Sequence, residues 1–118
     1  TTSLLGSKTT DLIQTREGDI YISTESRGLL KCGRDDGKLT SVLSSDLTGM
    51  IYSLCVNSGE IWLGTQRGLL RYNPATGLYH RYVSFSTASI DDRVHVVYST
   101  ANGRLMVGTT LGLMEYDD

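Results

Sequence analysis

The stretch Gly59-Glu-Ile-Trp-Leu-Gly-Thr-Gln-Arg-Gly-Leu-Leu-Arg-Tyr72 decides the fold of this chain, because versions of it occur three times. An earlier copy runs from Gly18 to Cys32, and a later copy runs from Gly103 to Tyr116. The opening glycines of the three copies lie 41 and 44 residues apart. Short apolar segments that recur every 40–45 residues or so, and that are separated by glycine turns, are typical of the blades of a β-propeller.

The lengths of the connections predict the order of the strands. Turns rich in Gly, Asn and Asp separate the apolar segments and have the length of hairpin loops. Two longer connections, residues 44–49 and 85–93, then carry the chain from one blade to the next. The expected strands are inner strands near 10–15, 50–56 and 94–100, second strands at 19–24, 60–65 and 104–109, third strands at 28–32, 68–72 and 112–116, and outer strands near 38–43 and 78–84.

We therefore predict an all-β fold made of β-propeller blades, with two complete four-stranded antiparallel blades and three strands of a third. The expected blades span residues 5–46, 47–89 and 90–118. A closed ring of six such blades needs about 250 residues, so we expect this chain to be a fragment of a larger propeller or a partial propeller completed by association. No segment has a helical period, and we expect minimal helix.

The second strand of each blade supports this architecture. Residues 20–22, 61–63 and 105–107 are apolar at every position and do not alternate with polar residues. Such strands are expected where a sheet is covered on both faces. Trp62, whose equivalents are Tyr21 and Met106, is therefore expected to pack between blades.

Composition excludes several functions for this segment. The chain has 118 residues, an apolar fraction of 39% and a net charge of −2, which gives no drive toward nucleic acid. It has no run of 18 apolar residues, so we expect no membrane contact by this segment. Cys32 and Cys55 lack metal-ligand spacing and are expected to be buried hydrophobes, with their redox state open. His80 and His95 lack nearby carboxylate partners, so we expect no metal site, cofactor or catalytic residue.

Residues 59–77 strongly resemble the two-component regulator propeller repeat, which occurs in the sensor ectodomains of bacterial hybrid two-component histidine kinases. The resemblance rests on the apolar run that ends in Gly64-Thr65, the following Gly68-Leu69, and Arg71-Tyr72. It recurs in all three copies, although the first copy has Ser23 in place of the glycine.

The resemblance implies a non-catalytic sensor or ligand-binding segment on the periplasmic or extracellular side of a bacterial inner membrane. It implies a response to oligosaccharides, with the kinase and phosphorelay elsewhere in a membrane-anchored parent protein. Two alternatives are a protein–protein interaction scaffold and, with less support, a fragment of a propeller lyase or glycosidase. A lyase would need a cluster of polar residues at the mouth of the ring, and the sequence shows none.

The second-to-third-strand turns and the connections between blades should emerge at one end of the sheets, because strands alternate in direction. We expect a ligand-binding rim there, since arginine binds carboxylates of acidic sugars or of a partner's loop. The predicted rim residues are Arg27, Gln66, Arg67, Asp91, Asp92 and Arg93. Apolar blade faces and an unpaired strand edge also predict self-association.

Overall fold

The computed structural model describes residues 8–82, 93–110 and 112–116, and they form three antiparallel sheets with one short helix. The first sheet contains β1 (Thr9–Gln14), β2 (Ile20–Thr24), β3 (Leu29–Cys32) and β4 (Leu39–Leu43). The second contains β5 (Ile51–Asn57), β6 (Glu60–Thr65), β7 (Gly68–Tyr72) and β8 (Tyr79–Tyr82). The third contains β9 (Val94–Ser99), β10 (Leu105–Thr109) and β11 (Gly112–Tyr116).

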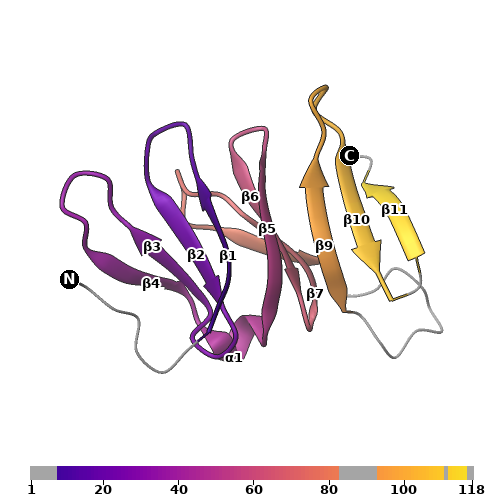
Figure 1. The fold of residues 1–118 in the computed structure, drawn as a ribbon, viewed down its shortest axis with the longest axis horizontal. Coiled ribbons are helices and arrows are strands. Elements are labelled where there is room, and N and C mark those ends of the chain that lie inside the picture. Colours follow the sequence, from indigo (N-terminus) through magenta and orange to yellow (C-terminus); the bar gives the residue numbers. More distant parts are fainter. Residues whose placement is uncertain (1–7, 83–92, 111, 117–118) are drawn as a thin grey trace.

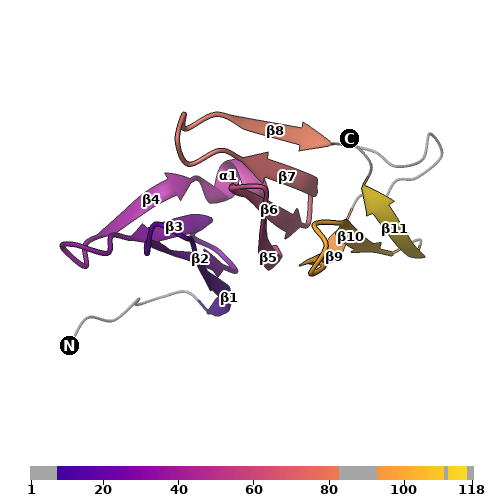
Figure 2. The ribbon, with the colours of Figure 1, turned by 90° about the horizontal axis from the view of Figure 1, so that it is seen from above.

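This arrangement confirms the predicted fold class of two four-stranded blades and three strands of another. The sheets lie side by side in chain order (Figure 1), and their first strands β1, β5 and β9 gather on one side of the molecule (Figure 2). Each strand lies within two residues of its predicted position along the described chain. The expected boundaries at residues 5, 89 and 90 lie outside the described residues, and the blade spans stay a prediction.

The connection between the first two sheets contains α1 (Ser45–Thr48), a helix that the sequence did not predict. The Ser44 hydroxyl caps this helix by accepting a hydrogen bond from the Asp46 amide at 3.1 Å. Gly49 ends it with a φ of +63°, a conformation that glycine adopts without steric cost. A single four-residue helix among the described residues fits the expectation of minimal helix.

A threonine at the end of the second strand closes the same turn in every sheet. Thr24, Thr65 and Thr109 each donate a side-chain hydrogen bond to the carbonyl of the glycine that follows the turn, over 2.9, 2.8 and 3.0 Å. In the first two sheets the same hydroxyl also accepts the amide of Arg27 or Arg67. The repeated Thr therefore fixes the turn at which the predicted rim residues lie.

Two apolar clusters hold the three sheets together. The first lies between the first and second sheets and includes Tyr21, Leu43, Ile51 and Leu63. The second lies between the second and third sheets and is built around Trp62, Leu69, Val94, Val97, Leu105 and Val107. Trp62 is buried there, as its neighbours in the sequence predicted. Because the second sheet is covered on both faces, its strand β6 is apolar at consecutive positions.

Gly64 allows the backbone of the third sheet to approach the second sheet closely. A Cβ atom at this position would lie only 2.7 Å from the Val94 carbonyl oxygen of β9. In the first sheet Ser23 takes this place, and its hydroxyl donates to the Asp11 carbonyl at 3.2 Å. Backbone approach thus explains the glycine at position 64, and the serine of the first sheet is tolerated because its hydroxyl has a partner.

Candidate functional site

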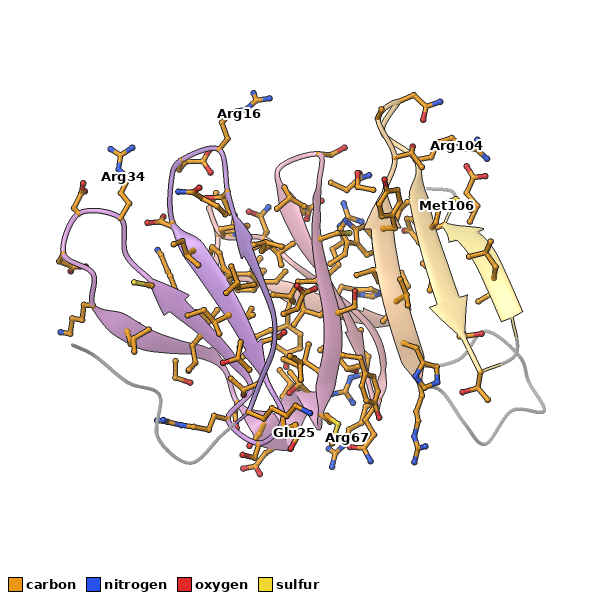
Figure 3. The ribbon with its side chains drawn as sticks, in the orientation of Figure 1. Arg16, Glu25, Arg34, Arg67, Arg104 and Met106 are labelled. Atoms are coloured by element: carbon orange, nitrogen blue, oxygen red, sulfur yellow. The ribbon has the colours of Figure 1, made fainter. Side chains whose placement is uncertain are left out.

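The turns that the sequence placed on a rim lie at the end of the sheets that carries α1. Glu25 and Arg67 lie at this end, while Arg16 and Arg34 lie at the opposite end (Figure 3). Inner strands β5 and β9 begin at the α1 end (Figure 1), so Arg93, which directly precedes β9, belongs to it too. We call the described members Arg27, Gln66, Arg67 and Arg93 the α1-end rim; Asp91 and Asp92 lie outside the described residues.

Gln66 and Arg67 hold the helical connection in place. The side-chain oxygen of Gln66 accepts from the Met50 backbone amide at 3.3 Å. The backbone amide of Gln66 donates to the Met50 carbonyl at 2.8 Å. The Arg67 guanidinium donates to the Asp46 carbonyl at 2.7 Å. Arg81 of β8 donates to the neighbouring Leu47 carbonyl. Two arginines therefore bind carbonyls of α1, a position that favours cations.

A further polar group lies beside these residues, at the boundary between the second and third sheets. The rings of Tyr52 in β5 and His95 in β9 lie 5.3 Å apart. The His95 Nε2 is 3.1 Å from the Thr110 hydroxyl, and both side chains are exposed. Since Arg93 precedes His95 by two residues, this part of the rim combines an imidazole, a phenol ring and an exposed guanidinium. Such a set can hydrogen-bond a polar ligand and stack on it.

The structure adds a second candidate, a groove on β7 and β8 toward the end opposite α1. The groove has a volume of about 410 Å³. Its lining residues are Glu60, Arg71, Asn73, Thr76, Leu78, Tyr79, His80 and Tyr82. We call it the Arg71 groove. Residues 78–82 along the groove include two tyrosines and a histidine, and the half-exposed Tyr79 shows that the strand is open here.

Arg71 organises the floor of this groove. Its guanidinium bonds to Glu60 at 2.6 Å, lies 5.2 Å from the Trp62 ring centroid and donates to the Tyr82 hydroxyl at 3.4 Å. The hydrogen bond that Arg71 donates to Glu60, and then the one that it donates to Tyr82, raise the pKa of Arg71 above its ordinary value. The Tyr82 hydroxyl lies 3.0 Å from that of Tyr116, and both rings contact Trp62.

The same residues lead into a smaller cavity between the second and third sheets. This cavity has a volume of about 270 Å³ and shares Glu60 and Arg71 with the groove. Arg104 and Glu115 form an exposed ion pair at its far side, which raises the pKa of Arg104 and lowers that of Glu115. The Trp62 indole nitrogen is buried beside them without a protein hydrogen-bond partner.

The sequence held a signal for this second candidate. Lys31, Arg71 and Glu115 occupy the same place in the three copies, directly opposite Tyr21, Trp62 and Met106. An arginine across from a tryptophan in one copy alone indicates a local ion–aromatic contact. Its pairing with Glu60 of β6 and with Tyr82 of β8 depends on how the side chains of these neighbouring strands are oriented, which the repeat does not reveal.

The described residues show little sign of other chemistry. No group of three or more His, Cys, Asp and Glu side chains among them is arranged to hold a metal ion. None of their helices is long and apolar enough to cross a membrane. Burial, and next the charge of Asp11, raise the pKa of the Cys55 thiol to about 12, so this thiol is protonated near neutral pH.

Neither a protein-family model nor a curated protein sequence matches the chain. Several solved structures, in contrast, match the fold of this chain. The extracellular domain of a proposed hybrid two-component system from B. thetaiotaomicron is 23% identical with a TM-score of 0.77, over 98% of this chain and 16% of that one. A second domain of that description and organism is 17% identical with a TM-score of 0.78, over 97% of this chain and 16% of the other.

The same fold also occurs in an enzyme. A catalytically inactive virginiamycin B lyase from Staphylococcus aureus is 16% identical with a TM-score of 0.70, over 95% of this chain and 42% of the lyase. At such identities the likeness shows a shared fold, and fold alone does not assign activity. The chain spans about one sixth of the length of the two extracellular domains that it matches.

Proposed function

We propose that this chain is a non-catalytic, ligand-binding segment of the extracytoplasmic sensor of a bacterial hybrid two-component system. The observation that carries the proposal is the overlap, across nearly the whole chain, with the extracellular domains of two proposed systems of this kind. The repeated motif supports it independently, because residues 59–77 resemble the propeller repeat of such sensors. The histidine kinase and phosphorelay would lie elsewhere in a membrane-anchored parent protein.

The proposed ligand is an oligosaccharide. Sugars combine many hydroxyl groups with an apolar ring face made of C–H groups. Their sites therefore combine hydrogen-bonding side chains with exposed aromatic rings. Both candidate sites have that composition. The α1-end rim adds arginines, which suit an acidic sugar, while the Arg71 groove offers Tyr79 and His80 beside a neutralised Arg71–Glu60 pair.

Signalling from such a segment needs a difference in affinity. A ligand shifts an equilibrium only if it binds one arrangement of the receptor more tightly than another. The α1-end rim draws residues from the turns of two sheets and from the start of β9, so a ligand there would contact more than one sheet. We propose this rim as the primary site for that reason.

Calorimetric titration tests the proposal with two probes, a digalacturonate and the neutral disaccharide cellobiose. We expect the acidic probe to bind more tightly. The variant in which Arg27, Arg67 and Arg93 are all changed to Ala should weaken its binding at least about tenfold, since charge-assisted hydrogen bonds to a carboxylate are lost. Circular dichroism checks that the variant is folded, because Arg67 also holds α1.

Tyr79→Ala is the matched variant in the Arg71 groove. It should leave binding of the digalacturonate unchanged if the rim is the site. Loss of binding in Tyr79→Ala with full binding in the triple arginine variant would move the site to the groove. Absence of binding for either probe and for a wider set of neutral and acidic oligosaccharides, with the protein folded, would overturn the ligand proposal.

A further inference from the structure

A crevice lies between the first and second sheets at the end opposite α1. It consists of two adjoining hollows of about 510 and 270 Å³, which share Thr15, Glu17 and Gly59 in their walls. The turn between β1 and β2 forms one side, and the turn between β5 and β6 forms the other (Figure 1). Both sheets that enclose it have four strands. We call it the Glu17 crevice; it shares no lining residue with the α1-end rim or the Arg71 groove.

Tyr21 brings into this crevice a polar atom that the protein itself does not satisfy. The residue is only 1% exposed, and its ring lies 6.3 Å from that of Tyr72, centroid to centroid. Tyr21 nevertheless lines the crevice, and among the described residues its hydroxyl has no hydrogen-bond partner. Buried polar groups in native proteins normally have a partner, which is either protein or a molecule from outside it. The Tyr21 hydroxyl therefore indicates that a polar group from outside the protein occupies the crevice.

The carboxylates of the crevice determine which polar group it suits. Asp19 is already satisfied, because its Oδ1 accepts the Arg34 amide at 3.0 Å and its Oδ2 lies 3.7 Å from the Lys31 ammonium. Glu17 lies exposed at the mouth, and its carboxylate forms no ion pair within the described part of the chain. The Arg34 guanidinium binds the carbonyl of Glu17 and not its carboxylate. A carboxylate without a cation, beside a buried hydroxyl, favours a ligand that supplies a positive charge.

The boundary between the second and third sheets has an equivalent cavity that lacks this carboxylate. Its volume is also about 270 Å³, and it is lined by the residues that correspond in the repeat to Asp19, Tyr21 and Lys31, which are Glu60, Trp62 and Arg71. The ion pair between Glu60 and Arg71 is closer, at 2.6 Å, and Ser58 stands where the first copy has Glu17. The cavity is thus common to both boundaries, and the additional negative charge belongs to the first boundary.

We propose that the Glu17 crevice binds the primary ammonium group of a small polar molecule. The Glu17 carboxylate and the Tyr21 hydroxyl oxygen accept hydrogen bonds from the ammonium. Pro74 and Ala75 of the turn between β7 and β8 line the same hollow and contact the carbon skeleton of the ligand. Amino sugars and aliphatic diamines both carry such a group, and the experiment below separates these two sources. The site is independent of the α1-end rim and does not require an oligosaccharide to bind there.

Titrations with glucosamine, glucose and cadaverine at slightly acidic pH, followed by proton–nitrogen correlation NMR, test the proposal. Glucosamine carries an ammonium where glucose carries a hydroxyl, so it should bind at least about tenfold more tightly. The backbone amides of Thr15 and Gly59 in the crevice should shift, and that of Gly68 at the α1 end should not. Cadaverine binding as tightly as glucosamine would assign the site to amines of any skeleton, and weaker binding would assign it to amino sugars.

Two variants remove the proposed contacts without changing the packing of the sheets. Glu17→Gln keeps the size of an exposed side chain and removes its charge, so it should weaken glucosamine binding at least about tenfold. Tyr21→Phe keeps the buried ring and removes the hydroxyl, so it should weaken binding by about threefold or more. Glu25→Gln is the matched control, because it removes the same charge at the α1 end (Figure 3). It should bind glucosamine like the unmodified chain.

Equal affinities for glucosamine and glucose would overturn the proposal, as would full glucosamine binding by Glu17→Gln. Equal weakening in Glu17→Gln and Glu25→Gln would overturn it too, because the net charge of the chain, and not this crevice, would then attract the amine. Binding of the digalacturonate by Glu17→Gln should equal that of the unmodified chain. This last measurement separates the crevice from the α1-end rim, so that either proposal can fail while the other stands.

Discussion

At the scale of single residues, Asp11 is the clearest contributor to the contact between the first two sheets. Its Oδ2 accepts the Leu54 amide of β5 at 2.9 Å, while its Oδ1 accepts the Leu12 amide. Removal of the Asp11 side chain takes this acceptor away from the Leu54 amide. A buried amide that loses its partner carries the full cost of its desolvation.

Asp11→Ala should therefore lower the free energy of unfolding by about 1–3 kcal/mol. Urea titration followed by tryptophan fluorescence measures this difference. Asp11→Asn is the matched control, because its side-chain oxygen can still accept from the Leu54 amide, and it should lose less than half as much. Equal losses in both variants would show that the charge of Asp11, and not the acceptor, stabilises the boundary.

Cys32 and Cys55 are half-buried, which corrects the expectation that both are buried, and the Cys55 thiol predicts an alkaline limit of stability. Its pKa is about 9 without the fold and about 12 within it, because burial and the nearby Asp11 disfavour the thiolate. Above pH 9 the unfolded chain releases this proton while the folded chain keeps it, so unfolding becomes easier. The contribution is complete below pH 9 and is lost as the pH rises toward 12.

Thermal unfolding between pH 8 and pH 10.5 tests this linkage. The melting temperature of the unmodified chain should fall more steeply over this range than that of Cys55→Ala, which has no thiol to titrate at this position. Tyr21, whose pKa burial raises to about 12, is present in both proteins and so cancels in the comparison. Parallel curves for the two proteins would contradict the assignment to Cys55.

At the scale of strands, the approach of β9 to β6 depends on the missing side chain of Gly64. Gly64→Ala should destabilise the chain by about 1–3 kcal/mol, because the new methyl group would meet the backbone of Val94 at 2.7 Å. Gly108→Ala is the control at the same place in the next copy, where the nearest atom is a Val96 carbon at 3.5 Å. It should change stability by less than about 0.5 kcal/mol.

Chemical denaturation of both glycine variants, at concentrations where the chain is monomeric, makes the comparison. Neither position has the positive φ that would strain alanine, so the two substitutions differ in their surroundings alone. Equal losses at both positions would show that backbone propensity, and not the contact with Val94, limits residue 64.

The strands were predictable from the sequence because each lies between local signals. Glycines at the turns and the repeated Thr at the end of the second strand mark the same places in all three copies. The helix α1 was not predictable in this way, because it occurs in one connection and depends on Ser44 as its cap. The Arg71 groove was missed for a related reason, since it joins residues from three different strands of the second sheet and the turn between two of them.

The α1-end rim shows which properties of a residue the sequence could predict and which it could not. Alternation of strand direction was enough to place Glu25 and Arg67 at one end of the sheets (Figure 3). It could not show that Gln66 and Arg67 bind the backbone near α1, because those bonds depend on a helix outside the repeat. The matching positions of Arg27 and Arg67 in two copies therefore predicted where these residues lie. The hydrogen bonds that a side chain forms depend on the segments packed around it, and the repeat does not contain those.

At the scale of the whole molecule, the three sheets lie in a row in which the second sheet contacts both of the others through a core. In repeat architectures of this kind, stability is close to a sum of single-unit terms and nearest-neighbour terms. Damage to one boundary should consequently loosen the sheet at that end and leave the opposite end protected.

Trp62→Ala and Tyr21→Ala test this with hydrogen exchange measured by mass spectrometry. Each truncation removes about 3–5 kcal/mol from one boundary, because a large buried ring leaves a cavity. Trp62 lies in the core between the second and third sheets, so its loss should speed exchange in β9–β11 far more than in β1–β3. Tyr21 lies in the core between the first and second sheets, and its loss should give the reverse pattern. Uniform loss of protection in both variants would mean that the three sheets unfold as one cooperative unit, and nearest-neighbour coupling would then fail to describe this chain.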